Sequence, residues 1–144
     1  MFERIIVATD GSDHAKEAVK VACDLAGKYG SRLHIVHTPQ AIGDTLIVGY
    51  TAVPVPPTKE EIEKAGREVI GATEAAVREA GITEFTSQLV SGDPAHAIVE
   101  EAKAHKSDLI VMGRRGLGSL TGLLVGSTTT KVAQLAPCAV LTVK

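Results

Sequence analysis

The sequence contains no tryptophan, and only 3% of its residues are aromatic. Proteins that bind single-stranded nucleic acid stack bases on aromatic side chains, so this function is not expected here. Neither charge sign dominates. The sequence has 15 Lys and Arg residues and 17 Asp and Glu residues, which gives a net charge of −2. It therefore has no excess of positive charge that would attract a polyanion. We therefore expect no nucleic-acid partner.

Long apolar runs are also missing. No run reaches the roughly 18 residues that a membrane-spanning helix needs, so we expect no membrane partner. The first eight residues, Met1 to Ala8, lack the three regions of a signal peptide and instead resemble a strand. Only two cysteines occur, Cys23 and Cys138, and they show no metal-binding or redox spacing. These absences favour a cytoplasmic protein, and 144 residues fit one domain, 1–144.

Five short apolar runs alternate with longer amphipathic segments. The runs are typical of strands, and two of them, Ile5–Ala8 and Leu109–Met112, are continuously apolar, as in strands buried on both faces. The predicted strands are Glu3–Thr9, Arg32–Thr38, Glu84–Ser91, Asp108–Met112 and Cys138–Val143.

The intervening segments have helical periodicity and recognisable ends. The first predicted helix runs from about Asp13 to Gly30, with Ser12 as its N-cap. Thr58 and Glu61 form the pattern of a capping box for the second, which Gly81 ends. The apolar residues of the second helix that predict its buried face are Ile62, Ala65, Val69, Ala72, Ala76 and Ala80. The remaining two helices are predicted from Asp93-Pro94 to about His105 and from Thr129 to Ala136.

This alternation predicts an α/β fold of three layers, with a doubly wound parallel sheet covered by helices on both faces. Ligands of such sheets bind beyond the carboxyl ends of the strands, where the strand order reverses. Polar, glycine-bearing turns follow the first and fourth predicted strands, at Thr9–Ser12 and at Gly113. If both turns contact one ligand, those strands are neighbours, and the predicted order of the five strands is 3-2-1-4-5.

The most informative motif is G-x2-G-x9-G-[ST], formed by Gly113, Gly116, Gly126 and Ser127. It lies between a predicted strand and a predicted helix. Glycines allow backbone N–H groups to approach a phosphate closely, and the start of a helix offers unpaired N–H groups and a positive dipole end. Ordinary turns also contain glycines, but three in six residues at a strand end favour an anion site.

Other phosphate motifs are absent. No lysine follows Gly126, which excludes a Walker A loop, and the first predicted turn has only Gly11, which argues against a dinucleotide site. Arg114 and Arg115 could each pair with phosphate, although consecutive residues seldom both face a ligand. Asp10 could bond a ribose hydroxyl, hold a metal ion through water, or cap the following helix; its position favours a ligand.

No catalytic base can be identified from spacing. His34 and His37 are three apart on a strand, so they point to opposite faces and cannot share a metal; His96 and His105 are nine apart on a helix. No catalytic triad and no metal site are predicted, so binding is favoured over rapid turnover.

Two further segments suggest contacts with other chains. The last strand, Cys138–Val143, is uncharged and would lie at a sheet edge, which predicts a homodimer through this edge. The long stretch 39–57 is predicted as a loop with four prolines and an apolar centre, and it could be a lid, a subunit contact or a linker.

The quoted motifs, together with Ile5–Ser12, Gly92–Ala95 and Ala136–Val143, resemble the universal stress protein family, in its ATP-binding branch. The resemblance covers nearly the whole chain. It implies a Rossmann-like fold of the adenine nucleotide alpha hydrolase type, dimerisation through the last strand, and ATP, AMP or ADP bound at the switch point, with Mg2+ held mainly by phosphates.

The resemblance also implies a set of nucleotide contacts. The main chain of Ala8 and Thr38 would flank adenine, and Asp10 and Gly113 would hold the ribose. The full expected set is Ala8, Thr9, Asp10, Thr38, Met112, Gly113, Arg114, Arg115, Gly116, Gly118, Gly126, Ser127, Thr128 and Thr129. Two residues depart from the family pattern: Ala8 replaces a common proline, and Arg114 replaces a small hydroxyl residue.

These features imply a nucleotide-dependent regulator of the stress response. A slow ATPase remains an alternative, because positioning and Mg2+ can promote phosphoryl transfer without a dedicated base. A dimeric interaction module without nucleotide is the third possibility.

Overall fold

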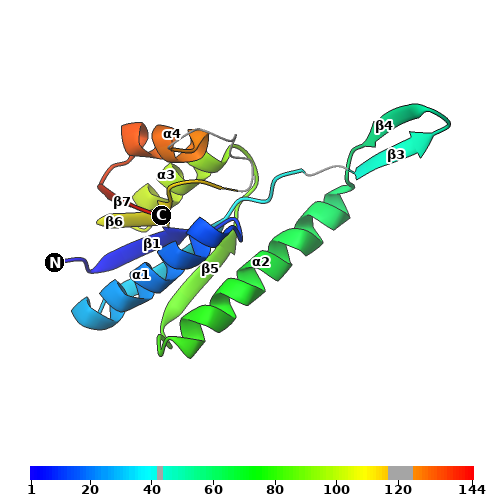
Figure 1. Ribbon diagram of the computed structural model, residues 1–144. Helices are drawn as coiled ribbons and strands as arrows, with labels where there is room; N and C mark the ends of the chain where they lie inside the picture. Colours follow the sequence, from blue (N-terminus) through cyan, green and yellow to red (C-terminus); the bar gives the residue numbers. More distant parts are fainter. Residues whose placement is uncertain (42–43, 117–124) are drawn as a thin grey trace.

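The protein has a parallel main sheet between two layers of helices, and a separate two-stranded hairpin (Figure 1). The computed structural model describes residues 1–41, 44–116 and 125–144. The strands are β1 (Arg4–Ala8), β2 (Arg32–His37), β3 (Asp44–Val48), β4 (Thr51–Val55), β5 (Phe85–Leu89), β6 (Leu109–Gly113) and β7 (Ala139–Val143). The helices are α1 (Asp13–Tyr29), α2 (Lys59–Glu79), α3 (Pro94–Ala104) and α4 (Ser127–Leu135).

The order of the main sheet is β5-β2-β1-β6-β7, with all neighbours parallel. In terms of the five predicted strands this is 3-2-1-4-5, so the predicted fold class and strand order are confirmed. The order reverses at β1, because the chain passes from β1 to β2 on one side and later returns to β6 on the other. The carboxyl ends of β1 and β6 are therefore neighbours, in the register Ala8 to Met112.

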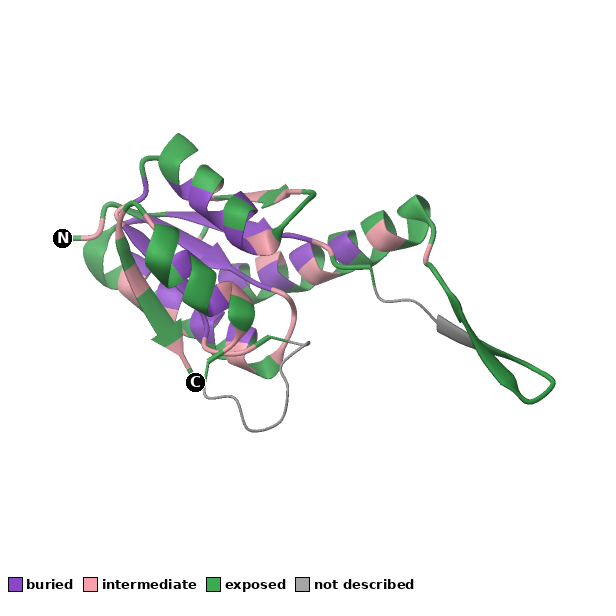
Figure 2. Ribbon diagram, turned by 90° about the horizontal axis from the view of Figure 1, so that it is seen from above, coloured by how far each residue is buried: buried purple, intermediate pink, exposed green. Residues whose placement is uncertain are grey.

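Each face of the sheet buries its own apolar core. Alternate residues such as Val7, Ile35 and Val111 pack against α1 and α2. Their neighbours in the chain, such as Ile6 and Ile110, pack against α3 and α4. The central strands are buried on both sides (Figure 2), which explains their continuously apolar sequences.

The predicted helix caps are present. Ser12 Oγ accepts a hydrogen bond from the Ala15 amide at 3.3 Å, and Gly30 ends α1 in the left-handed conformation, with φ 67°. Both hydrogen bonds of the capping box between Thr58 and Glu61 are formed. Asp93 caps α3 ahead of its first-turn proline. These local signals predict helix ends because they satisfy backbone groups within a few residues of themselves.

The predicted buried face of α2 is wrong. The buried residues are Gly66, Ile70, Thr73 and Val77, whereas Ala65 and its alanine neighbours on the predicted face are exposed. Gly66 explains the shift, because a β-carbon there would lie 2.7 Å from Pro39 Cγ and 2.8 Å from Leu89 Cδ2. The α2 helix presents Gly66 to the sheet and therefore packs close to the sheet. The alanines lie on the solvent-exposed side of α2, where small apolar side chains cost little.

The prediction that the stretch 39–57 is a loop is wrong, because it contains two strands. β3 and β4 form an antiparallel hairpin around Gly49, which has φ 67°, and Tyr50. The hairpin projects beyond the start of α2, away from the main sheet (Figure 1). Its strands are apolar and a two-residue turn joins them, which is a recognisable hairpin signal. Pro54 is tolerated because each strand of a two-stranded ribbon has a free edge.

Among the described helices, none is both long enough and apolar enough to cross a membrane.

Candidate functional site

The first βα turn, at the end of β1, is held by short side chains. Asp10 Oδ1 accepts a hydrogen bond from the Ser12 amide at 2.9 Å, and Thr9 Oγ1 accepts one from the Gly11 amide at 3.3 Å. Gly11 has φ 80°, a conformation that other residues rarely adopt. The turn is therefore a fixed platform for Asp10 beside the carboxyl end of β6.

The loop after β6 reaches this platform. A β-carbon built on Gly116 would clash with Asp10 Oδ2, because it would lie closer to this atom than real contacts allow. Any larger residue at position 116 would force the end of the Asp10 side chain or the loop to move. The structure thus brings together Asp10 and Gly116, which are far apart in sequence and were both predicted as site residues.

Gly113 has a different reason to be glycine. It is buried at the end of β6, and a β-carbon there would lie 2.9 Å from the Ala15 nitrogen and 2.9 Å from two atoms of His14. The first turn of α1 packs directly on this glycine. The structure shows close packing of the helix on the strand at Gly113, and the expected contact of Gly113 with the ribose stays a prediction.

The start of α4 lies next to the same loop. The Gly126 amide donates to the Arg114 carbonyl at 2.8 Å, and Thr129 Oγ1 donates to the Gly113 carbonyl at 3.0 Å. Within the described residues no side chain caps the helix at Gly126, and the first turn of α4 contains no acidic residue. The first-turn N–H groups and the positive end of the helix dipole are thus uncompensated by any side-chain cap, which suits an anion.

Several polar atoms of predicted site residues are buried without a hydrogen-bond partner among the described residues. They are Thr38 Oγ1, Arg114 Nε and Arg115 Nε. Such atoms usually find a partner, so their position fits a site that a polar ligand completes. The Thr38 carbonyl, expected beside adenine, accepts a long hydrogen bond of 3.4 Å from Gln40 Nε2.

The remaining predicted residues differ in what they offer. The side chains of Ala8 and Met112 belong to the core under α3 and α4, so only their main chain is available to a ligand. Ser127 is exposed and Thr128 half-buried, while the Thr129 hydroxyl is already engaged. Gly118 lies outside the described residues.

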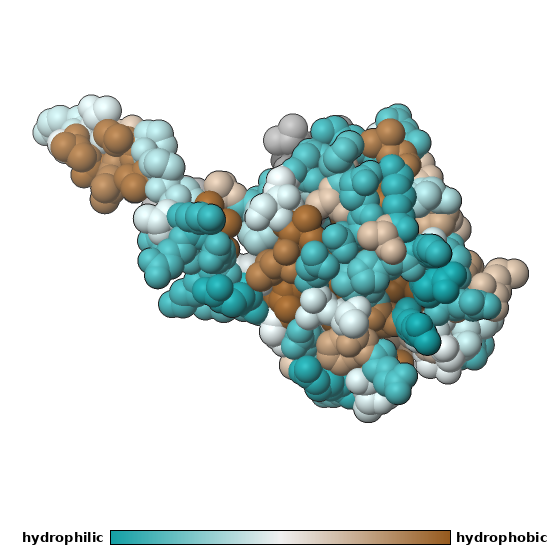
Figure 3. Space-filling model, turned by 180° about the vertical axis from the view of Figure 1, so that it is seen from behind, coloured by the Kyte–Doolittle hydropathy of each residue, from teal (hydrophilic) through white to brown (hydrophobic). Residues whose placement is uncertain are grey.

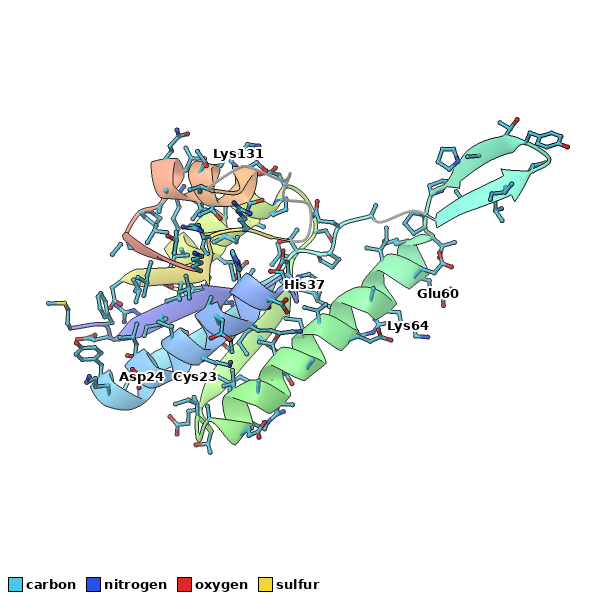
Figure 4. All side chains as sticks on the ribbon, in the orientation of Figure 1. Cys23, Asp24, His37, Glu60, Lys64 and Lys131 are labelled. Carbon is cyan, nitrogen blue, oxygen red and sulfur yellow. The ribbon has the colours of Figure 1, made fainter. Side chains whose placement is uncertain are left out.

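His37 is a neighbour of this site that sequence reasoning missed. It is buried at the carboxyl end of β2 (Figure 4), and its Nδ1 donates to the Thr9 carbonyl at 2.7 Å. Burial lowers the pKa of His37, while this hydrogen bond and the charge of Asp10 oppose the shift. A neutral His37 therefore ties the end of β2 to the turn that holds Asp10. The only sequence signal was its position at a strand end.

A groove of about 370 Å3 lies elsewhere, at the root of the hairpin. Its lining includes Gln40, Val55 and Ile62 but none of the predicted nucleotide contacts. We place the candidate site at the switch point, because that is where the polar turns, the glycine contact and the helix start meet.

A model of the universal stress protein family matches residues 1–144. The chain belongs to the universal stress protein family. A protein of Thermus aquaticus described as the universal stress protein in the QAH/OAS sulfhydrylase 3′ region is 40% identical over 144 residues, which is all of both chains.

Solved structures share the fold. A universal stress protein in complex with cAMP is 30% identical, with a TM-score of 0.74 over 99% of this chain and 97% of that one. The universal stress protein of Archaeoglobus fulgidus in complex with dAMP has a TM-score of 0.72 over 99% and 98% of the two chains; at 24% identity it shows the fold alone. Both of these universal stress proteins hold an adenine nucleotide.

Proposed function

We propose that this chain binds ATP, or AMP, at the switch point and acts as a nucleotide-dependent regulator of the stress response. The observation that carries the proposal is the contact between the Asp10 carboxylate and Gly116, beside a helix start without a side-chain cap. Asp10 would accept a hydrogen bond from the ribose, and the Gly116 loop with the start of α4 would bind the phosphates. These two parts of the proposed site lie next to each other, as a mononucleotide requires. The cAMP complex of a 30% identical relative supports an adenine nucleotide.

Each part of the nucleotide has proposed partners. Asp10 accepts from a ribose hydroxyl, and the main chain of Ala8 and Thr38 flanks adenine. The main chain of Gly116 and Gly126 and the first-turn residues Ser127, Thr128 and Thr129 hold the phosphates, with Arg114 or Arg115 adding charge. Mg2+ would be bound mainly by phosphate oxygens and would neutralise part of their charge.

The proposed preference for ATP over cAMP follows from the ribose hydroxyls and the phosphates that each nucleotide presents. In cAMP the 3′-hydroxyl is esterified and one phosphate is folded back on the sugar. A site that uses a carboxylate for ribose hydroxyls and a helix start for extended phosphates should therefore prefer ATP. Protein stripped of nucleotide and titrated calorimetrically should bind MgATP more tightly than cAMP, and tighter binding of cAMP would refute the assignment of ATP.

Asp10→Asn tests the ribose contact. A carboxylate accepts a stronger hydrogen bond than an amide by about 1 kcal/mol, so we expect the affinity for ATP to fall by about fivefold to tenfold. Asp13→Asn is the matched control, because Asp13 is an exposed carboxylate in the first turn of α1. If both variants bind ATP as the wild type does, Asp10 does not hold the ribose.

We also propose a homodimer through β7. This strand lies at the edge of the sheet, carries no charge and exposes Leu141, and an unpaired apolar edge favours pairing with a second copy. The projecting hairpin is a competing surface, because Leu46, Ile47 and Tyr50 are exposed on it (Figure 3).

Sedimentation equilibrium distinguishes the two surfaces. We expect a dimer at micromolar concentration that Leu141→Lys converts to a monomer, since the new charge would lie within the paired edge. Leu46→Lys on the hairpin should leave the dimer intact. The reverse pattern would assign the interface to the hairpin, and a monomeric wild type would contradict the dimer.

A further inference from the structure

A cluster of His34, Glu101 and His105 lies on the α3 side of the sheet, away from the switch point. His34 is on β2, nearer its amino end, whereas Glu101 and His105 are one turn apart at the end of α3. Because α3 packs antiparallel to the strands, its end lies near their amino ends, opposite the proposed nucleotide site. Spacing in the sequence could not reveal this cluster, since His34 and Glu101 are 67 residues apart and belong to different elements.

The three side chains present their ligand atoms to one another. Glu101 Oε2 lies 3.4 Å from His34 Nε2 and 3.4 Å from His105 Nε2, and all three ligand atoms lie within 4.8 Å of one another. A tetrahedral zinc ion with bonds of about 2.1 Å has ligands about 3.4 Å apart. Two of the three separations therefore already match.

The key observation is the buried environment of His34 Nε2. The His34 side chain is only 7% exposed, and its buried Nε2 makes no hydrogen bond that meets ordinary geometric criteria within the described residues, although Glu101 Oε2 lies 3.4 Å away. Burial and the neighbouring His105 lower the pKa of His34, although Glu101 opposes the shift, so the ring is kept in the neutral form that binds metals. In the tautomer with the proton on Nδ1, a buried lone pair on Nε2 faces a carboxylate, a costly arrangement that a cation between them would relieve.

The other nitrogen of His34 has an outer partner. His34 Nδ1 and Thr86 Oγ1, on β5, are 2.6 Å apart. When Nδ1 donates this hydrogen bond, the lone pair of Nε2 faces Glu101. Metal-binding histidines usually have their second nitrogen fixed in this way, which sets the tautomer and the ring orientation.

We propose that His34, Glu101 and His105 form a binding site for a borderline transition-metal dication such as Zn2+, with water as the fourth ligand. Two imidazoles and one carboxylate favour such ions over Mg2+ or Ca2+, which prefer oxygen ligands. The His34 and His105 rings are stacked, with centroids 3.8 Å apart and planes inclined by 24°, so their lone pairs do not yet converge. His105 must turn its ring to bind, and its 38% exposure leaves room for this.

The bound ion would join the end of α3 to the amino-terminal half of β2, and it would stabilise the folded protein. The test uses tag-free, chelator-treated, nucleotide-free protein, titrated calorimetrically with Zn2+ alone and with Co2+, whose visible absorption reports tetrahedral ligation. We expect one ion per chain, micromolar or tighter affinity, and a higher melting temperature with Zn2+.

His105→Ala and Glu101→Gln should each lower the Zn2+ affinity by more than about tenfold, and Thr86→Val by about tenfold through the outer partner. His96→Ala is the matched control, because His96 is an exposed histidine on the same helix and should change nothing. Both His105 and Glu101 lie near the surface, so folding should survive their replacement.

Three results would overturn the site: no 1:1 binding by the wild type, equal affinity in wild type and His105→Ala, or loss of binding in Cys138→Ser but not in His105→Ala. The last result would assign the ion to a free thiol. None of these outcomes depends on nucleotide binding, so this proposal and the proposed function fail separately.

Discussion

Gly116→Val is expected to lower the affinity for ATP by about a hundredfold. A β-carbon at this position would clash with Asp10 Oδ2, so the branched side chain must displace the carboxylate or the loop. The variant would lose the proposed ribose contact and the close phosphate contact together. Polar contacts of this kind contribute about 1 to 3 kcal/mol each, and 1.4 kcal/mol corresponds to a factor of ten. Titration of nucleotide-free protein with MgATP measures the effect.

The control for this variant is Gly71→Val. Gly71 is an exposed glycine of α2, and a β-carbon there would meet nothing within 4 Å. The chemical change is the same, but ATP affinity should be unchanged. Because Gly116 is exposed and its β-carbon would meet the movable end of the Asp10 side chain, Gly116→Val should melt near the wild-type temperature. Wild-type affinity in Gly116→Val would show that the loop does not approach a phosphate.

Gly113→Val should instead destabilise the fold, by about 3 kcal/mol. A β-carbon at Gly113 would lie 2.9 Å from the backbone of His14 and Ala15, and backbone atoms cannot rotate away as a side-chain end can. Overpacking of a filled core typically costs about 1 to 3 kcal/mol, and this contact belongs at the upper end. Urea denaturation would show a lower midpoint with an unchanged slope.

Gly71→Val is again the control, and it should shift the free energy of unfolding by less than about 0.5 kcal/mol, as surface substitutions usually do. A Gly113→Val variant as stable as the wild type would mean that α1 does not pack on this glycine. Together the two variants separate glycines of one motif: one is expected to serve the ligand and the other the fold.

The sequence predicted the strand order because ligand chemistry, and not pattern alone, constrained it. Two polar turns were expected to share one ligand, and that requirement placed the first and fourth predicted strands side by side. The structure then brought Asp10 and Gly116 together. Helix caps such as Ser12 and Thr58 were predictable because their hydrogen bonds stay within one turn.

What was missed depends on contacts distant in sequence. The buried face of α2 is set by Pro39 and Leu89 lying against Gly66, which no helical periodicity can reveal. The hairpin was obscured by its prolines. His34 and His105 looked unremarkable within their own elements, and their cluster exists only because α3 packs over β2.

The most direct test of a nucleotide site at the switch point is to identify what the protein carries. The purified wild type would be denatured, and the released small molecules identified and quantified by chromatography. We expect an adenine nucleotide, chiefly ATP, at close to one per chain, and almost none from Gly116→Val. A wild type that releases no adenine nucleotide, and acquires none after incubation with MgATP, would contradict this expectation.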